Sequence, residues 1–173
     1  SQDVTFGLVL NLRDLPINGV EAILGPCINI CPVRVQSQQA WTVSDLCHNL
    51  HDSYTTVSRH GYVELPDIVA NCTDWPRDSD FGCLINHFPP DRTPSFSLKD
   101  ADVVDFSMDT RIDLTDQLLV RSIVGEGTWE VQVLTSSNLM SNEKASVLAE
   151  RLLKTGQTFS QYPEVPLSSH LLR

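Results

Sequence analysis

The alternation of hydrophobic and polar positions predicts a sheet flanked by helices. Residues 5–12 and 27–35 are apolar runs with the β-rich composition of well-buried strands. Pro32 lies inside the second run and favours an edge or irregular position, because proline cannot donate a hydrogen bond to a neighbouring strand. Between the runs, residues 14–18 form a predicted loop and residues 19–24 a helix of about a turn and a half.

The clearest helical pattern begins at Thr42. Thr42 and Asp45 resemble a capping box in which Asp replaces the usual Glu. Apolar positions at helical spacing then define one inward face: Val43, Leu46, Cys47, Leu50, Tyr54 and Val57. Gly61 is expected to end this helix, and a second one starts near Glu64 and runs to about residue 71.

Strand and helix patterns also mix in the second half of the chain. Residues 80–87 and 104–108 predict single strands, and residues 117–124 and 129–135 a hairpin. A last helix covers about residues 142–161. Its predicted inward residues are Val147, Leu148, Leu152 and Phe159. Because strands and helices do not alternate strictly, the pattern favours an α/β layered sandwich over a doubly wound sheet.

Composition narrows the classes of protein that this chain can belong to. Its 173 residues and 41% hydrophobic content predict one domain with a core of ordinary size. The formal net charge of -10, without a basic stripe, argues against nucleic-acid binding. No apolar run approaches the roughly 18 residues that a membrane span needs. The start at Ser1 shows no secretory pattern and suggests a segment of a longer protein.

The cysteines and aspartates have plain interpretations. Five cysteines without framework spacing predict buried free thiols in a reducing compartment.

Six aspartates form one acidic stretch: Asp100, Asp102, Asp105, Asp109, Asp113 and Asp116. A calcium loop needs closer spacing and a glycine for its sharp turn, so this stretch predicts a solvated face.

Candidate chemistry among the other side chains is sparse. His48 and His51 share a predicted helix face, but zinc would need further ligands and His-Glu-x-x-His is absent, so we expect no metal site. Nucleotide-binding and serine-hydrolase motifs are also absent. Arg13, Trp75 and His87 remain as single candidates, for which packing or surface roles are the plainer interpretation.

Several short motifs, in their order along the chain, resemble the second half of fungal nonribosomal peptide synthetase condensation domains. Residues 6–13 (FGLVLNLR) match the family's Phe-Gly strand, whose usual Ser-Gly-Arg ending is Asn-Leu-Arg here. Residues 24–29 (LGPCIN) match Ile/Val-Gly-x-Phe-Val-Asn, with Cys27 in the aromatic position, and residues 32–34 (PVR) complete that motif. Of the family's His-x-x-x-Pro-Phe-Glu, only His60 is kept.

This resemblance implies a chloramphenicol acetyltransferase-like lobe with a mixed sheet and flanking helices. Residues 1–173 would be the single C-terminal lobe of a two-lobed condensation domain. The N-terminal lobe, which holds the catalytic His-His-x-x-x-Asp-Gly motif, is absent from this chain. The implied enzyme is an acyltransferase that forms amide bonds between carrier-bound aminoacyl or peptidyl thioesters and an amine. It acts only when paired with the N-terminal lobe.

The resemblance also implies partners and site residues. It places Arg13 and Asn29 beside the substrate tunnel and His87 at the crossover to the other lobe, with no catalytic residue and no metal in this chain. Expected partners are the N-terminal lobe, peptidyl carrier domains and the carrier-bound peptide substrate, without nucleic acid or membrane. No cofactor is bound directly, because phosphopantetheine is carried by the carrier domains. The expected location is cytoplasmic.

Three versions of the function remain open, and ordinary chain extension is the first of them. The altered ending at Asn11 and Leu12 mildly favours a divergent subtype, and a terminal domain that releases product by intramolecular cyclisation is one such subtype. The alternative is a degenerate, non-catalytic condensation lobe that acts as a docking module for carrier domains.

Overall fold

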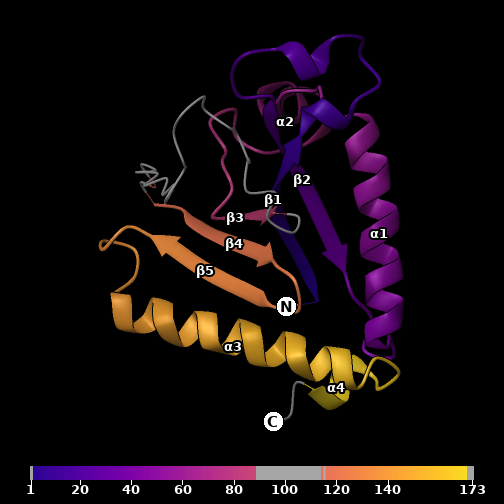
Figure 1. Cartoon of the computed structure of the whole chain (residues 1–173), viewed down its shortest axis with the longest axis vertical. Coiled ribbons are helices and arrows are strands. Elements are labelled where there is room, and N and C mark those ends of the chain that lie inside the picture. Colours follow the sequence, from indigo (N-terminus) through magenta and orange to yellow (C-terminus); the bar gives the residue numbers. More distant parts are fainter. Residues whose placement is uncertain (1, 89–113, 115, 171–173) are drawn as a thin grey trace, which may run out of the picture.

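A five-stranded mixed sheet forms the centre of the structure (Figure 1). The structure is a computed structural model, and it describes residues 2–88, 114 and 116–170. The strands are β1 (Asp3–Asn11), β2 (Ile28–Gln36), β3 (Cys83–Phe88), β4 (Leu118–Val124) and β5 (Trp129–Thr135), in the spatial order β2-β1-β3-β4-β5. The pairs β1–β2 and β4–β5 are antiparallel, whereas β1–β3 and β3–β4 are parallel. The predicted mixed sheet and hairpin are therefore confirmed.

Two long helices flank the sheet. Helix α1 (Val43–Arg59) contacts β2, and α3 (Asn142–Gln161) contacts β5 (Figure 1). The shorter elements are α2 (Leu65–Cys72), α4 (Leu167–His170) and the 3-10 turns η1 (Leu12–Asp14) and η2 (Val20–Ala22). None of the described helices is long and apolar enough to cross a membrane.

Local sequence signals account for several of these element boundaries. The Thr42 hydroxyl accepts a hydrogen bond from the Asp45 amide at 3.1 Å, and the Asp45 carboxylate accepts one from the Thr42 amide at 2.9 Å. This is the reciprocal capping box expected from the sequence. Pro32 lies in an edge strand, as predicted, because β2 is the first strand of the sheet.

Strand register separates the hydrophobic side chains into two layers. On one face, Gly7 is paired with Leu84 and Leu84 with Leu119, next to the buried cluster of Phe81, Leu84, Leu114 and Leu119. The opposite face presents Trp129, whose ring occupies the space that a side chain at Gly156 of α3 would fill. Leu10, Cys31 and Val33, which are 4%, 2% and 3% exposed, lie on this second face, so the predicted layered sandwich buries apolar residues on both faces of its sheet.

The structure corrects some predicted details. The predicted helix over residues 19–24 is only the three-residue turn η2, because Gly19 is left-handed and gives no side-chain cap. Side chains expected to face inward are exposed at Cys47, Tyr54 and Val147. Cys47 and Cys72 are exposed free thiols, so the prediction of buried cysteines is wrong for them. The predicted strand 104–108 lies outside the described residues. So do the residues of the acidic stretch other than Asp116.

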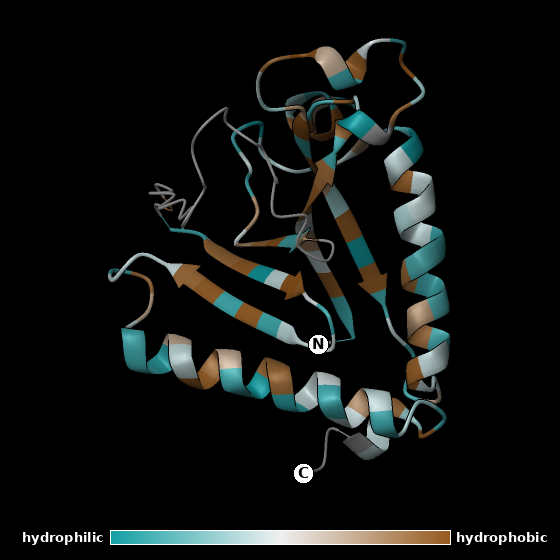
Figure 2. Ribbon diagram, viewed as in Figure 1, coloured by the Kyte–Doolittle hydropathy of each residue, from teal (hydrophilic) through white to brown (hydrophobic). Residues whose placement is uncertain are grey.

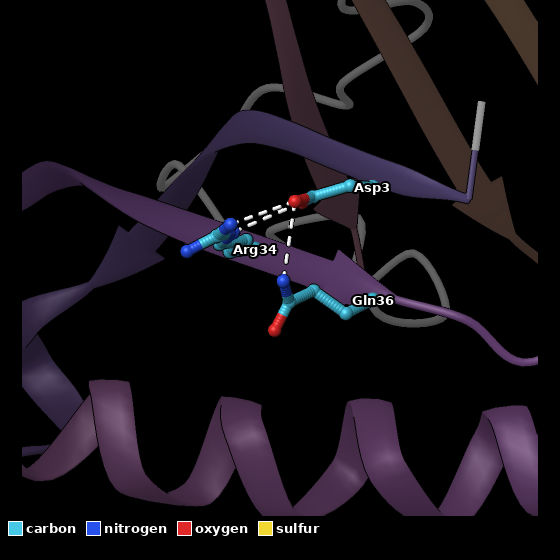
Figure 3. A network of polar contacts seen from close by, with 3 residues as sticks. All are labelled: Asp3, Arg34 and Gln36. Carbon is cyan, nitrogen blue, oxygen red and sulfur yellow. Dashed lines mark hydrogen bonds and ion pairs between the residues drawn. The ribbon is translucent and has the colours of Figure 1, made fainter.

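A polar cluster joins the beginning of β1 to the end of β2 (Figure 3). The Arg34 guanidinium donates to Asp3 at 2.6 and 2.9 Å, and the Gln36 amide donates at 3.1 Å. Arg34, followed by Gln36, lowers the pKa of Asp3 from 3.8 to about 2. Because the folded-state pKa is depressed, this cluster stabilises the fold above about pH 4 and loses its effect as pH falls through 2.

We expect an NMR titration of the Asp3 carboxyl carbon to give a midpoint near 2, with other carboxylates as internal references. In Arg34→Gln the midpoint should move back towards 3.8, because the largest cause of the shift is gone. A midpoint near 3.8 in the unaltered protein would contradict the cluster.

Candidate functional site

The predicted site residues Arg13, Asn29 and His87 lie at one end of the sheet. Strands β1, β3 and β4 are parallel, so their carboxyl ends share an edge, and antiparallel β2 begins at that edge. Arg13 follows β1, Asn29 is the second residue of β2, and His87 is the penultimate residue of β3. Chain topology therefore brings Arg13, just after β1, to the same edge as Asn29 and His87, although each makes a separate set of hydrogen bonds.

Arg13 holds the connection between β1 and β2 in place. One terminal nitrogen of its guanidinium donates to the carbonyls of Val20 and Glu21, at 2.8 and 3.4 Å. The other donates to the carbonyls of Ile23 and Gly25, at 2.9 and 2.8 Å. A guanidinium can serve several acceptors at once because its donors form a rigid planar fork. Arg13 is thus bound within its own loop, as a positioning residue.

The same loop depends on glycine for its course. Gly25 has a φ of 127°, a conformation that side-chain-bearing residues rarely adopt. The Leu12 amide donates to the Cys27 carbonyl at 2.8 Å and closes the loop at its base. The glycine and arginine of the two sequence motifs therefore shape one compact connection, which we call the β1–β2 loop (residues 15–27).

Asn29 connects β2 to the segment between α1 and α2. Its amide nitrogen donates to the carbonyls of Gly61 and Val63, at 2.7 and 2.8 Å. Its amide oxygen accepts from the Ile30 backbone at 2.8 Å. Gly61 is buried, and a side chain there would come within 3.1 Å of Leu10. Asn29 therefore uses its side-chain amide to satisfy backbone groups at a tightly packed corner.

His87 belongs to a polar group that the sequence did not reveal. Its ring Nδ1 lies 3.1 Å from the Ser122 hydroxyl oxygen, and the Trp129 indole N–H donates to the same oxygen at 2.9 Å. Among the described residues, no hydrogen bond involves the ring Nε2. The His87 side chain is exposed.

The positions of Ser122 and Trp129 near His87 result from strand pairing, which the local sequence does not show. Ser122 is the registered partner of His87 in the parallel pair β3–β4, and Trp129 comes from the far strand of the hairpin. The residues are separated by 35 and 42 positions from His87, and no local motif links them.

The remaining titratable residues do not form a second centre in the described part of the chain. Burial raises the pKa of the Cys31 and Cys83 thiols, which favours their protonated form. No three His, Cys, Asp or Glu side chains among the described residues converge to hold a metal ion. The His48 ring is engaged by the Ser44 carbonyl at 2.8 Å.

The chain belongs to the Condensation domain family, whose model matches residues 1–172. It is 33% identical over 166 residues to nonribosomal peptide synthetase fmqA of Aspergillus fumigatus, covering 96% of this chain and 4% of that protein. It is 38% identical over 169 residues to nonribosomal peptide synthetase asqK of Emericella nidulans, covering 91% of this chain and 7% of that protein. The chain thus spans a small fraction of the fungal synthetases that it resembles.

Solved structures show the same fold. The structure described as "The crystal structure of CT" has a TM-score of 0.88 and 33% identity, covering 96% of this chain and 38% of that one. The starter condensation domain of rhizomide synthetase RzmA matches with a TM-score of 0.68. The match covers 98% of this chain and 39% of that one, and its 15% identity shows the fold alone. These matches confirm the predicted chloramphenicol acetyltransferase-like fold with a mixed sheet and flanking helices.

Proposed function

We propose that residues 1–173 form the C-terminal lobe of a two-lobed condensation domain that makes amide bonds in a fungal peptide synthetase. The observation that supports this most directly is a family match over residues 1–172 in a chain without His-His-x-x-x-Asp-Gly. The chain also covers only 38% of the CT chain that it matches, which leaves room for a second lobe with that motif. The second lobe would lie upstream in the same polypeptide or in a separate chain.

In the proposed reaction, an amine attacks the carbonyl carbon of a carrier-bound thioester. A C–N bond forms, the C–S bond breaks, and the thiol of the carrier's phosphopantetheine leaves. The histidine of the other lobe assists the attack, as a base or by stabilising the developing charge. This lobe supplies a wall that orients the substrates, and such orientation can contribute about 7 to 11 kcal/mol.

The edge that bears Arg13, Asn29 and His87 is the proposed tunnel wall. The internal hydrogen bonds of Arg13 and Asn29 support a shaping role for these two residues. The exposed ring of His87, with its Nε2 available, supports direct contact with substrate or with the other lobe. His87 is therefore the residue of this chain that we expect to affect turnover without affecting stability.

The matches to CT structures support a terminal, cyclising condensation domain as the subtype. Two of the CT structures, one of them described as holo T3CT, share 33% identity and a TM-score of 0.88 with this chain. The starter domain and the first condensation domain of the CDA synthetase share 15% and 14%, with TM-scores of 0.68 and 0.71. Release of product as a macrocycle would follow from this subtype.

The test is turnover by the complete synthetase with its carrier domain loaded with a peptidyl thioester. We expect mass spectrometry to detect amide formation, and a cyclic product if the domain is terminal. His87→Ala should lower turnover by about tenfold or more, which corresponds to 1.4 kcal/mol of barrier. His51→Ala is the matched control, because His51 is an exposed histidine on α1, away from this edge.

The outcomes separate the parts of the proposal. No amide product, together with a second lobe that lacks His-His-x-x-x-Asp-Gly, would instead support the docking-module alternative. Equal turnover in His87→Ala and His51→Ala would remove His87 from the site while leaving the family function in place.

A further inference from the structure

A line of contacts joins helix α3 to the ring of His87. Hydrophobic and hydrophilic residues alternate along β5 (Figure 2), which places Trp129 on one face of the sheet with the two valines of that strand. Helix α3 lies along β5 (Figure 1), and the Trp129 ring occupies the space that a side chain at Gly156 would fill. The indole N–H of Trp129 in turn reaches the Ser122 hydroxyl, which lies beside His87.

The direction of the two hydrogen bonds at Ser122 follows from the donors that are available. An indole nitrogen can only donate, so the Ser122 oxygen accepts from Trp129, at 2.9 Å. The other hydrogen bond of this hydroxyl among the described residues joins it to the His87 Nδ1, at 3.1 Å. If Nδ1 carried a proton, the Ser122 oxygen would accept twice and its own hydrogen would have no acceptor in this group. The arrangement that uses every donor therefore has the Ser122 O–H donating to Nδ1.

This direction assigns the proton of the neutral His87 ring. A neutral imidazole carries one ring proton, so one of its nitrogens donates and the other accepts. Because Nδ1 accepts from Ser122, the proton lies on Nε2. The second hydrogen bond strengthens this preference, since a hydroxyl that accepts from the Trp129 indole becomes a better donor.

We propose that a relay from α3, through Trp129 and Ser122, holds His87 as an Nε2–H hydrogen-bond donor. Ser122 and Trp129 are positioning residues, and Gly156 leaves the room that the indole needs. His87 then acts by donating to an acceptor oxygen, and not as a base through Nε2. The acceptor is a carbonyl oxygen of the carrier-bound peptidyl chain. The identity of this acceptor rests on the proposed function, whereas the protonation of the ring is independent of it.

The first test is the position of the ring proton in His87. The 173-residue chain contains five histidines, and after 15N labelling of these residues, nitrogen–proton correlation spectra show which ring nitrogen is protonated. The His87 signal is assigned by its loss in His87→Gln. We expect Nε2–H at His87, and a ratio of Nε2–H to Nδ1–H that falls about fivefold in Ser122→Ala, the effect of losing one typical hydrogen bond. Ser137→Ala, at an exposed serine in the turn after β5, should leave the ratio unchanged.

Two further variants test the contribution of α3. Trp129→Phe keeps an aromatic ring but removes the N–H, so the Ser122 oxygen is free to accept from Nδ1 and the ratio should fall severalfold. Gly156→Ala should have the same effect, because its methyl group displaces the indole, even though alanine favours a helix more than glycine does. Thr155→Ala, at an exposed residue of α3, is the control and should not change the ratio. Trp129→Phe decides the question by itself if Gly156→Ala does not fold.

The second test distinguishes a donor from a base by turnover in the complete synthetase. His87→Gln keeps a side-chain N–H donor but has no basic nitrogen. It should therefore recover most of the turnover that His87→Ala loses. Ser122→Ala should lower turnover severalfold, because the ring then presents its donor nitrogen less often.

Each result supports or contradicts a defined part of the inference. An Nδ1–H ring in the unaltered chain, or an unchanged ratio in Ser122→Ala, would overturn it. A ratio that responds to Ser122→Ala but not to Trp129→Phe would contradict the relay from α3. Equal losses of turnover in His87→Gln and His87→Ala would contradict the donor role. An Nε2–H ring without amide product in the complete synthetase would support the positioning of His87 and contradict the proposed function.

Discussion

Gly7→Val is expected to reduce the free energy of unfolding by about 3 kcal/mol, the upper end of the usual cost of overpacking a core. A Cβ atom at Gly7 would lie 2.6 Å from side-chain atoms of Leu84 and Phe81, and 2.9 Å from Ile30. Leu84 and Phe81 are buried in the main cluster, so they have little space to move away. Urea unfolding followed by tryptophan fluorescence measures the loss.

Gly82→Val is the matched control for this substitution. A Cβ atom at Gly82 would meet no other atom within 4 Å, and we expect a change within about 0.5 kcal/mol. Valine favours strands, so a loss at Gly7 cannot come from β propensity. Equal effects at the two positions would show that close packing does not explain the glycine in the Phe-Gly strand.

Arg13→Ala is expected to cost about 3 kcal/mol, because four carbonyls lose a charged donor. Hydrogen bonds to charged groups contribute about 1.5 to 3 kcal/mol each, but three of these four are exposed and their effects are not additive. Urea unfolding measures the total loss. Hydrogen exchange of the amides in the β1–β2 loop should also become faster, which shows that the effect is local.

Arg77→Ala provides the control, because Arg77 is an exposed arginine for which no hydrogen bond is found among the described residues. We expect this variant to change stability by no more than about 0.5 kcal/mol. Unchanged loop exchange in Arg13→Ala would contradict the positioning role. Arg13 would then become available again as a residue that contacts substrate directly.

The positions of the family motifs acquire physical explanations from the structure. Gly7 allows Leu84 and Phe81 to approach the sheet, and Gly25 adopts a conformation reserved for glycine. Arg13 and Asn29 satisfy backbone carbonyls around the same sheet edge. The sequence resemblance placed Arg13 and Asn29 beside a substrate tunnel, and that placement stays a prediction. Their hydrogen bonds show that both side chains hold backbone segments of this chain in place.

The elements that the sequence predicted well are those with strong local patterns. Helix α3 has the predicted bounds of residues 142–161, and the capping box starts α1 at Val43 as expected. The hairpin strands β4 and β5 agree with the predicted runs to within one residue. Each depends on nearest neighbours along the chain, through helical periodicity, capping or two-residue alternation, and these are visible in the order of residues.

The misjudged elements depend on distant contacts. Residues 19–24 have the composition of a helix, but Arg13 binds carbonyls in this segment, which instead forms a loop after one 3-10 turn. Val147 has inward spacing on α3 and is nevertheless 49% exposed. Periodicity identifies an apolar stripe without showing which part of that stripe a neighbouring element covers.

The sequence by itself determined the fold class, most element boundaries and the resemblance to condensation domains, because these depend on local order and on motif spacing. Tertiary structure alone decided the strand order, the gathering of Arg13, Asn29 and His87 at one edge, and the contact of His87 with Ser122. It also decided that Arg13 binds carbonyls of the β1–β2 loop and that Leu24 in this loop is exposed. These features require strands that are distant in sequence to pair, and no residue pattern within one strand specifies its partner.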